Sequence, residues 1–479
     1  MTLLMLLEMI VAAMADRRGM GTTERGLTYQ QLYDRAGAGA EVIRRHGAQH
    51  LAYVAASDLA FPVALFSAAW AGVPFLPLNY RQSAESLCSL LAQHDDVLVI
   101  ADAPAAGWWD GSGLTVLSVE EWNAATAVAV EAAVSVTDGD DVAVLLYTSG
   151  TTAEPKAVVL RHRHLSAYVI GSVEFAAAPA EDASLVSVPP YHVAGVANVV
   201  SSVYGARRIV YLPAFSPEAW LATVRSEGIT HAMVVPTMLA RVVEQVGDHQ
   251  IAATPTLRSI AYGGARMPIS VLTRALVAFP TTDFVNAYGL TETSSTIAVL
   301  GPEDHRSGER LASVGRLVPG VEVEVRDGEI WVRGDQVSGE YLGHAVALDA
   351  NGWFATRDRG WVDADGYLFI EGRADDTIIR GGENIAPAEI EDVLLVHPAV
   401  ASCVVVGIPD DEWGQRIGAA VVLRPGAAAS AEELQEVVRA ALRSSKTPDV
   451  VVFRHDLPLT DSGKVLRRVV LADLLESGR

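Results

Sequence analysis

The sequence has little cysteine and no long uncharged apolar run. Its 479 residues include only Cys88 and Cys403, far apart in the chain, and this pair cannot form a disulfide framework or a four-cysteine zinc site. Such scarcity is typical of a reducing compartment, so we expect a cytoplasmic protein. Because no stretch reaches the roughly 18 uncharged apolar residues of a transmembrane helix, we also expect no stable membrane insertion.

The apolar N-terminus, residues 1–19, is the segment most similar to an export signal. It lacks a basic first part and carries Glu8 inside the apolar run, and neither feature is typical of a signal peptide. Leu4, Leu7 and Ile10 instead follow helical spacing. We therefore predict a helix that packs on the core.

Positive charge is also scarce, and lysine is the scarcest basic residue. Asp and Glu number 58 against 36 Lys and Arg, which gives a net charge of −22. That balance argues against non-specific binding to nucleic acid or to an anionic membrane, so any bound phosphate must be held by local groups. Lysine occurs only at Lys156, Lys446 and Lys464, in segments rich in Gly, Pro, Ser or Thr. Because a compact ammonium differs from a planar guanidinium, these lysines are candidate functional residues.

What the sequence does contain is the composition of a large globular protein. Half of its residues are hydrophobic, which excludes disorder, collagen and a coiled coil. At roughly 150 residues per domain, the length indicates about two to four domains. Short apolar runs alternate with helical patterns such as 62–72 and 217–228, so we predict α/β layers with largely parallel sheets. The runs expected as buried strands are 51–56, 96–101, 142–148, 184–189, 207–212, 231–236 and 258–264.

Two changes of pattern divide the rest of the chain. From about residue 311 the hydrophobicity alternates with period two around an Asp-Gly turn, which predicts a small antiparallel β section. After about residue 375 a new succession of helix and strand patterns is long enough for a separate α+β domain. The predicted organisation is a large N-terminal α/β domain, 1–373, followed by a small α+β C-terminal domain, 374–479.

One segment, 146–158, follows a buried strand and carries several hydroxyls, a glycine and a lysine. Hydroxyls, exposed backbone N–H groups and an ammonium are suited to hold phosphate oxygens. The segment is not a Walker loop, because Pro155 and Ala157 stand where that loop needs glycine and a hydroxyl residue. The alternative interpretation is a Ser/Thr-rich turn with a solvated lysine. The candidate residues are Thr148, Ser149, Gly150, Thr151, Thr152 and Lys156.

Three further segments each place a charged group in a turn. Glu292 lies among small hydroxyl residues after a strand end and could hold Mg²⁺ that bridges phosphates; the alternative is a helix start capped by Thr291. Asp358 could accept hydrogen bonds from ribose hydroxyls, and the alternative is a surface turn. Lys464 follows Gly463 near the C-terminus, where a lysine in a turn is usually solvated.

Together and in this order, the four segments resemble those of the adenylate-forming superfamily, which includes acyl- and aryl-CoA synthetases, adenylation domains of peptide synthetases, and beetle luciferases. The resemblance extends over nearly the whole chain and indicates the acyl-/aryl-CoA synthetase branch. Other segments that resemble family motifs are 28–32, 72–79, 262–265, 313–320, 339–342, 372–384, 406–410 and 446–448.

The resemblance implies a two-step reaction. The carboxylate of an acid attacks the α-phosphorus of ATP, pyrophosphate leaves, and the acyl-AMP then reacts with a thiol. Lys464 matches the family lysine that bridges carboxylate and phosphate, Glu292 the Mg²⁺ ligand, and Asp358 the ribose-binding residue. With His192, Lys464 and Glu292 are the expected catalytic residues. The residues that the resemblance assigns to ATP or AMP are Thr148, Ser149, Gly150, Thr151, Thr152, Lys156, Gly263, Gly264, Ala265, Asn286, Tyr288, Gly289, Thr291, Asp358 and Arg373.

The resemblance also implies a mobile C-terminal domain and a thiol acceptor on a flexible arm. The small domain is expected to rotate about a hinge at Asp375 between the half-reactions, and Gly381, Gly382 and Lys446 to line the pantetheine channel. The expected cofactors are ATP, Mg²⁺ and CoA, or a carrier-protein phosphopantetheine in place of CoA. The expected partners are small molecules, with an acyl carrier protein as the alternative and no nucleic acid.

The acid is expected to occupy an apolar pocket. Residues 190–195 resemble the aromatic-histidine motif of CoA synthetases, and 188–200 lack the aspartate with which amino-acid-activating members hold the α-amino group. The acid is therefore predicted to be uncharged away from its carboxylate, aliphatic or aromatic. The alternative for the histidine is an ordinary residue at a strand end. The expected pocket residues are Tyr191, His192, Val196, Ala197 and Val200.

Three residues, Ala153, Ala157 and Arg357, stand where the family usually has glycine. If these positions need a positive φ, each side chain costs about 1 kcal/mol, and an arginine near the phosphates could compensate. The principal hypothesis is an AMP-forming acyl- or aryl-CoA ligase. The alternatives are an enzyme that loads a carrier protein and a non-catalytic nucleotide-binding relative. The sequence leaves open the acid, its pathway and the oligomeric state.

Overall fold

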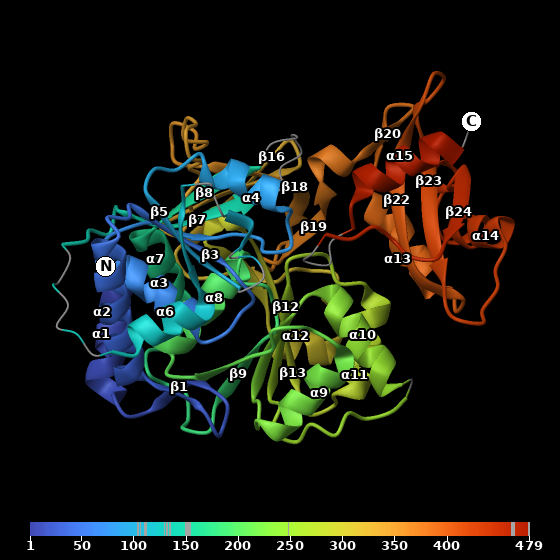
Figure 1. Ribbon diagram of the computed structural model, residues 1–479. Coiled ribbons are helices and arrows are strands. Elements are labelled where there is room, and N and C mark those ends of the chain that lie inside the picture. The colour runs from blue at the N-terminus through green and yellow to red at the C-terminus, as the bar shows by residue number, and fades with distance from the viewer. Residues whose placement is uncertain are drawn as a thin grey trace.

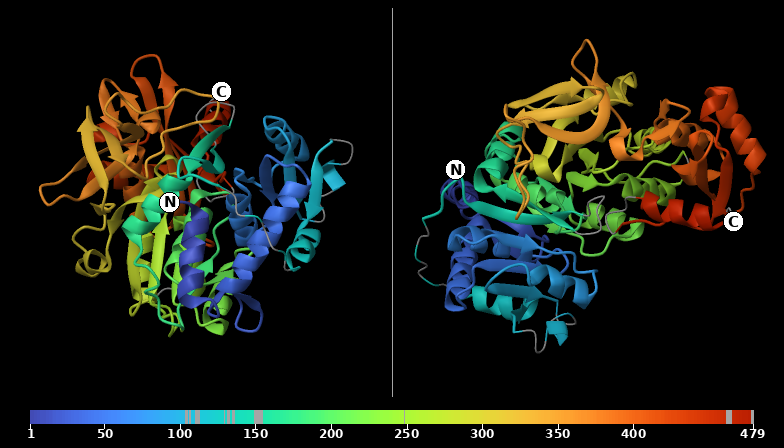
Figure 2. Two further views of the ribbon diagram at one scale, coloured as in Figure 1. Left: turned by 90° about the vertical axis from the view of Figure 1, so that its left-hand side faces the viewer. Right: turned by 90° about the horizontal axis from the view of Figure 1, so that it is seen from above.

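The structure is a computed structural model that describes residues 1–102, 105, 107–109, 113–128, 130, 133, 136–148, 155–247, 249–460 and 465–477. Most of the chain forms a large α/β body, and the C-terminal residues, orange to red, form a smaller body beside it (Figure 1). The N-terminus lies on the far side of the large body from this smaller one (Figure 2). The predicted α/β class, with a large N-terminal and a small C-terminal part, is confirmed.

A six-stranded sheet forms one half of the large body. Its first five strands are parallel, and the last pair, β7 with β8, is antiparallel. The strand order is β6 (Thr115–Ser118), β5 (Val97–Ala101), β3 (His50–Val54), β4 (Phe75–Pro77), β7 (Val142–Thr148) and β8 (Lys156–Arg161).

A nine-stranded sheet forms the other half. Six parallel strands occupy its middle, and antiparallel strands lie at both edges. The strand order is β15 (Arg316–Leu317), β14 (Ser295–Leu300), β13 (Asp283–Leu290), β12 (Ser259–Gly263), β11 (His231–Val234), β9 (Ala183–Val186), β10 (Arg208–Tyr211), β1 (Arg18–Gly21) and β2 (Gly26–Thr28).

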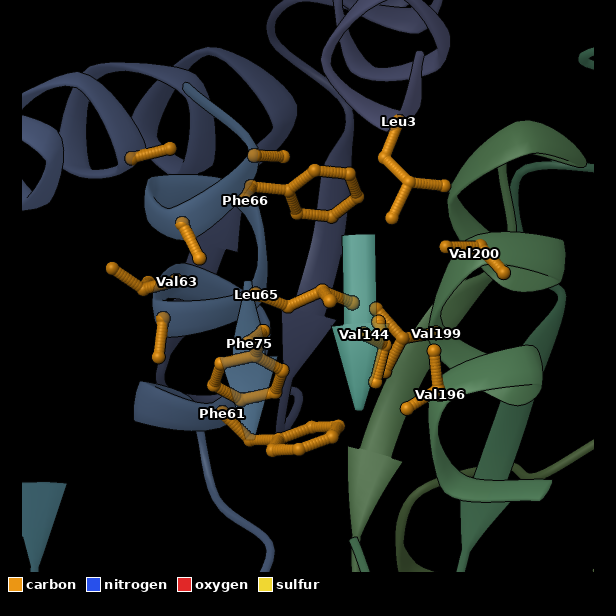
Figure 3. Close-up of a cluster of buried hydrophobic side chains, with 14 of the residues drawn as sticks. Leu3, Phe61, Val63, Leu65, Phe66, Phe75, Val144, Val196, Val199 and Val200 are labelled. Atoms are coloured by element: carbon orange, nitrogen blue, oxygen red, sulfur yellow. The ribbon is translucent and has the colours of Figure 1, made fainter. Parts of the chain in front are cut away.

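Helices connect and cover these strands, and the largest core cluster lies between the sheets. Apolar side chains of α1, α3 and α8 meet those of β4 and β7 there (Figure 3). The predicted N-terminal helix is confirmed as α1, whose Leu3, Leu7 and Ile10 are buried in this cluster. Within the described ranges, no helix is both long and apolar enough to cross a membrane. The helices of the large body are α1 (Leu3–Met14), α2 (Tyr29–Arg45), α3 (Ala60–Ala71), α4 (Ala84–Leu91), η1 (Gly107–Trp109), α6 (Val119–Thr126), α7 (His162–Ser172), α8 (Val193–Tyr204), α9 (Pro217–Ser226), α10 (Pro236–Val246), α11 (Ile269–Ala278), η2 (Thr291–Thr293) and α12 (Pro302–Ser307).

The predicted small β section is confirmed as a four-stranded antiparallel sheet. Its first hairpin turns at Asp327 and Gly328, whose φ angles are 50° and 77°. Two successive positive φ angles are what a two-residue hairpin turn of matching twist requires, and Asp-Gly is a preferred pair for it. The strands are β16 (Val321–Arg326), β17 (Glu329–Gly334), β18 (Phe354–Val362) and β19 (Leu368–Arg373).

The smaller body has its own three-stranded sheet. β22 pairs with β23 antiparallel and β23 with β24 parallel, and helices flank the sheet. Two clusters of buried apolar side chains consist only of residues from 378 onward. The elements are η3 (Ala374–Asp376), β20 (Ile378–Arg380), β21 (Glu383–Ile385), α13 (Pro387–Val396), β22 (Val400–Asp410), β23 (Gly414–Leu423), α14 (Ala431–Ala441), η4 (Ser444–Lys446), β24 (Val450–Arg454) and α15 (Arg467–Ser477).

Candidate functional site

The carboxyl ends of neighbouring parallel strands bring two predicted nucleotide segments together. Gly263 ends β12 and pairs in register with Ala287 of β13, so residues 263–265 lie beside 286–292. A Cβ on Gly263 would be 2.3 Å from the Ala287 carbonyl oxygen, and Gly264 has φ +80°. Only glycine fits both positions, which explains the sequence of this segment. Ligands of open α/β sheets bind at this edge.

A tight turn between β13 and β14 presents Glu292. Thr293 Oγ1 accepts a hydrogen bond from Leu290 N at 3.0 Å and donates one to Ser295 O at 2.8 Å. Ser294 and Ser295 have φ 56° and 109°, and such strain in non-glycine residues concentrates at functional sites. The segment is a 3₁₀ turn whose N-cap is Leu290, so the alternative of a helix capped by Thr291 is wrong.

Glu292 has a tyrosine partner that the sequence did not indicate as a site residue. Tyr341 Oη donates a hydrogen bond to Glu292 Oε1 at 2.8 Å. Burial and, after it, the Glu292 charge raise the pKa of the Tyr341 phenol, so this tyrosine stays a donor. Lys156 Nζ lies 5.9 Å from the centre of the same ring, within range of a cation–π interaction. Tyr341 therefore joins the predicted metal ligand to the predicted phosphate-binding lysine.

The backbone beside Tyr341 is fixed from two sides. Ser338 N donates to Glu292 O at 2.8 Å, and residues 340–342 pair with the outer edge of β8 through Val159 N to Glu340 O and Leu342 N to Ala157 O, both 2.9 Å. Glu340 also accepts two hydrogen bonds from the Arg161 guanidinium, at 2.9 and 2.7 Å. The segment 338–342 thus connects the six-stranded sheet to the turn at Glu292.

Asp358 lies in a second cluster. Its buried carboxylate accepts a hydrogen bond from Tyr288 Oη at 2.6 Å and one from Arg373 Nη1 at 3.2 Å. Burial, and next the Asp358 charge, raise the pKa of Tyr288 well above its ordinary value, so this phenol also stays protonated. Carboxylate oxygens accept hydrogen bonds from hydroxyl groups, which is the chemistry that ribose recognition requires. The structure brings these three predicted residues together, and Asp358 is not in a plain surface turn.

The three residues that replace the family's usual glycines differ in backbone strain. Arg357 has φ +59°, so the condition for backbone strain is met there. Ala157 lies buried in β8, paired with Tyr147, and its φ is not positive, so an alanine at that position is not strained. Ala153 lies outside the described residues.

Most of the predicted phosphate loop, from Ser149 to Thr152, and the predicted catalytic Lys464 lie outside the described residues as well. The two ends of the loop are placed: Thr148 of β7 pairs with Lys156 of β8, and Thr148 Oγ1 donates to Lys156 O at 3.4 Å. The hairpin therefore closes the loop at its base. Leu459 and Thr460, which precede the segment of Lys464, line a cavity at the ends of β9, β10 and β11.

A cavity of about 280 Å³ lies at the ends of β9, β10 and β11, where two prolines precede Tyr191. The rings of Tyr191 and His192 are 4.7 Å apart, and Tyr80 lies edge-on to Tyr191 at 5.8 Å. The residues that line the cavity are Ser57, Tyr80, Arg81, Ser187, Val188, Pro189, Pro190, Leu212, Pro213, Phe215, Val235, Thr237, Met238, Arg241, Leu459 and Thr460.

None of the five residues predicted for the acid pocket lines this cavity; Tyr191 and His192 directly follow its Pro189 and Pro190. Val196, Ala197 and Val200 of α8 are buried in the core cluster between the sheets, and Figure 3 shows Val196 and Val200 directed at the side chains of α3 and β7. Their apolar character serves core packing. Sequence reasoning missed Val235 and Met238, which follow β11, a strand end that the hydrophobic pattern did predict.

The predicted residues of the smaller body are also placed. Asp375 lies in η3, and Arg357 Nη1 is 4.0 Å from its Oδ2. Gly381 and Gly382 form the turn between β20 and β21, with φ 57° and 84°. Lys446 Nζ is 2.5 Å from Glu389 Oε2, so its ammonium is engaged in an ion pair.

The donor set fits Mg²⁺ held jointly with phosphates. Among the described residues, no group of three His, Cys, Asp or Glu side chains could hold a metal ion alone. Mg²⁺ usually takes one or two carboxylates, substrate phosphates and water. A single carboxylate such as Glu292, next to cationic side chains that suit phosphates, matches that pattern.

Comparisons with known proteins agree with this geometry. Residues 8–342 match the family model of the AMP-binding enzymes, and residues 389–464 match that of the AMP-binding enzyme C-terminal domain. The chain is 32% identical to the fatty acid–[acyl-carrier-protein] ligase ScoC of Streptomyces coeruleorubidus, over 93% of this chain and 91% of that protein. It is also 32% identical to a feruloyl-CoA synthase of an Amycolatopsis species, over 92% of each.

A solved structure resembles the whole chain. The o-succinylbenzoate-CoA synthetase MenE of Bacillus subtilis, in complex with its acyl-adenylate intermediate, superposes with a TM-score of 0.86 and 28% identity over 97% of both chains. The same enzyme in complex with ATP and a magnesium ion superposes with a TM-score of 0.85, at 28% identity, over 97% of this chain and 98% of that one.

Proposed function

Since the chain belongs to the family of AMP-binding enzymes, we propose that it activates an apolar carboxylic acid with ATP and transfers the acyl group to the thiol of CoA. In the first step a carboxylate oxygen bonds to the α-phosphorus, and pyrophosphate leaves with the electrons of the broken P–O bond. In the second step the thiolate sulfur bonds to the acyl carbon, and AMP leaves. The observation that carries the proposal is the pair of adjoining clusters around Glu292 and Asp358.

The first step brings two anions together, so the protein must supply positive charge and fixed donors. Lys464 bridges the substrate carboxylate and the α-phosphate, while Lys156 and the hydroxyls of 148–152 hold the β- and γ-phosphates. Glu292 holds Mg²⁺, which neutralises phosphate charge when bound. The hydrogen bond from Tyr341 orients that carboxylate in advance.

The ribose and base occupy the neighbouring positions. Asp358 accepts hydrogen bonds from the ribose hydroxyls, and Tyr288 and Arg373 orient its carboxylate. The bare backbone at Gly263 and Gly264 leaves room for the adenine beside Ala265. Asn286, Gly289 and Thr291 complete this side of the nucleotide site.

The second step requires the smaller body to move. The proposed domains are 1–373 and 374–479, with a hinge at Asp375, and the separate core clusters of the smaller body support rotation as a unit. Gly381 and Gly382 then border the pantetheine channel, and Lys446 lies at it. The positive φ of both glycines permits a close backbone approach there.

The acid enters the cavity beside Tyr191 and His192. Proline, valine, leucine and methionine supply much of its wall, and Arg81 and Arg241 are its charged residues. The apolar part supports a fatty or aromatic acid whose carboxylate faces the nucleotide. One relative is named for a fatty acid and another for the feruloyl group. A cytoplasmic location, where ATP and CoA are abundant and cysteines stay reduced, is part of the proposal.

A carrier protein is the second candidate acceptor, and the similarity to ScoC favours it. CoA and a carrier protein present the same phosphopantetheine arm, so both fit one channel. The nucleotide-binding relative without activity is the weakest candidate, because the sequence retains Lys464, Glu292 and Asp358.

Acid-dependent exchange of ATP with labelled pyrophosphate tests the proposal. A panel of aliphatic, aromatic and amino acids should give exchange with one apolar class and none with amino acids. Thioester formation is then measured with CoA and with a phosphopantetheinylated carrier protein. Exchange restricted to amino acids would contradict the apolar pocket, and no exchange with any acid would contradict adenylation.

A further inference from the structure

Arg357 is a strained and exposed residue at the edge of the nucleotide site. Its φ is +59°, a conformation that residues with a Cβ rarely adopt, and its N–H donates to Glu329 Oε1 at 3.1 Å. Along β18 its two neighbours, Thr356 and Asp358, are buried, whereas 62% of the Arg357 side chain is exposed. The backbone accepts strain to present this side chain to solvent beside the site.

Arg357 directly precedes Asp358 on β18, at the edge of the nucleotide site. Its charge and that of Arg373 act on the Tyr341 phenol, the hydrogen-bond partner of Glu292. Lys156 lies against the same ring. Arg357, Arg373 and Lys156 thus all act on Tyr341, in a chain with a net charge of −22.

The only ion pair that Arg357 makes within the described part of the chain is weak. Its partner, Asp375, is 4.0 Å away, and 46% of the Asp375 side chain is exposed. Exposed ion pairs of this kind contribute little, because both groups stay hydrated. A phosphate can replace this partner, since a guanidinium presents paired donors that match phosphate oxygens.

We propose that Arg357 is an additional phosphate-binding residue, whose guanidinium binds the terminal phosphates of ATP and, after the first step, the pyrophosphate. Asp375 is its partner when no polyphosphate is bound. The inference rests on the proposed function for the placement of the phosphates beside Glu292. It predicts a residue that distinguishes ATP from AMP, since AMP lacks the phosphates that Arg357 contacts.

Calorimetric titration of the full chain with MgATP and with AMP tests the inference without requiring turnover. Arg357→Gln should weaken MgATP binding about tenfold, the effect of losing one charge-assisted hydrogen bond, and leave AMP binding within about twofold. The MgATP affinity of Arg357→Lys should lie between that of Arg357→Gln and that of the unsubstituted protein. The matched control is Arg359→Gln, on the same strand, because the Arg359 side chain lies over Gly328 in the first hairpin. Its MgATP affinity should equal that of the unsubstituted protein.

Arg357→Gly separates the two effects of the side chain. Glycine adopts the positive φ freely, so the thermal midpoint without nucleotide should rise while MgATP binding falls. A purely structural arginine would give the opposite sign in stability and no change in MgATP affinity.

Unchanged MgATP affinity in Arg357→Gln, or an equal loss for MgATP and AMP, would overturn the inference. Suppose that Arg357→Gln selectively weakens MgATP binding, and that no acid in the panel supports pyrophosphate exchange by the unsubstituted protein. The inference then stands and the proposed function fails. The two results are therefore independent.

Discussion

The nucleotide side and the acid side of the site are built by different means. Around Glu292 and Asp358, each carboxylate already has a tyrosine donor at 2.6 to 2.8 Å. At the cavity beside Tyr191, the wall comes from strand ends and contains three prolines and other apolar side chains, together with two arginines and several Ser and Thr residues. The nucleotide side is set by fixed hydrogen bonds, the acid side by shape.

This difference predicts that substitutions on the two sides of the site change different kinetic quantities. Preorganised donors act on developing charge, so their loss reduces the rate. A shaped apolar wall distinguishes acids by about 1–3 kcal/mol per methylene-sized change, so its alteration changes which acid is used and leaves ATP kinetics intact.

Substitution of Lys464 should have the largest effect. Lys464→Ala should reduce acid-dependent pyrophosphate exchange by about 10³-fold, because it removes the cation between two anions, and should spare thioester formation from synthetic acyl-AMP. Lys446→Ala removes the same charge elsewhere in the smaller body. It should spare pyrophosphate exchange and slow thioester formation from acyl-AMP. Single-turnover assays of each half-reaction measure both, and equal losses in the two half-reactions would contradict the assignment.

Substitution of Glu292 should come next. Glu292→Gln keeps the shape and removes the charge, so exchange should fall about 10²-fold and the Mg²⁺ concentration for half-maximal rate should rise. Glu303→Gln, at an exposed glutamate of α12, is the control and should leave both values unchanged. An unaltered Mg²⁺ requirement in Glu292→Gln would remove Glu292 from the metal site.

On the acid side, Met238→Ala should enlarge the cavity. The ratio of kcat/KM between a longer and a shorter acid should shift about tenfold toward the longer one, while the KM for ATP stays constant. Met9→Ala, in a helix packed on the core cluster, should not change the ratio. A parallel fall for every acid would show that the cavity does not hold the acyl group.

Loss of the Tyr341 hydroxyl should have the smallest effect. Tyr341→Phe removes one hydrogen bond to Glu292 and should lower exchange about fivefold. Because the pKa of this phenol is raised, it stays a donor, and the ratio of rates should be constant from pH 6 to about 9. Tyr367→Phe removes a similar bond, to Asp304 at 2.7 Å, outside the site and should have no effect on exchange.

Local patterns predicted the elements well. Asp327-Gly328 marked the first hairpin of the small β sheet, and the apolar N-terminus packed as a helix. The strain at Arg357 was predictable as well, because the family has glycine there. The first two depend on neighbours in sequence, which a single sequence contains, whereas the strain at Arg357 also required the family resemblance.

Contacts between distant segments were not predictable in the same way. Tyr341 and Glu292 are 49 residues apart, and nothing in either segment identifies the other. Val196 and Val200 were expected at the acid because they follow the His192 motif. An apolar face of a helix, however, does not show in the sequence whether it packs against a ligand or against the protein core. Here it is the core, with Leu65 and Val144 opposite.

The pairing of residues 338–342 with β8 has a consequence beyond the site. β8 is the last strand of its sheet, and an unpaired edge strand is a template for association with other chains. The segment that carries Tyr341 covers this edge, so the part of the chain that orients the metal ligand also guards against aggregation. Selection for solubility and selection for catalysis then act on the same five residues.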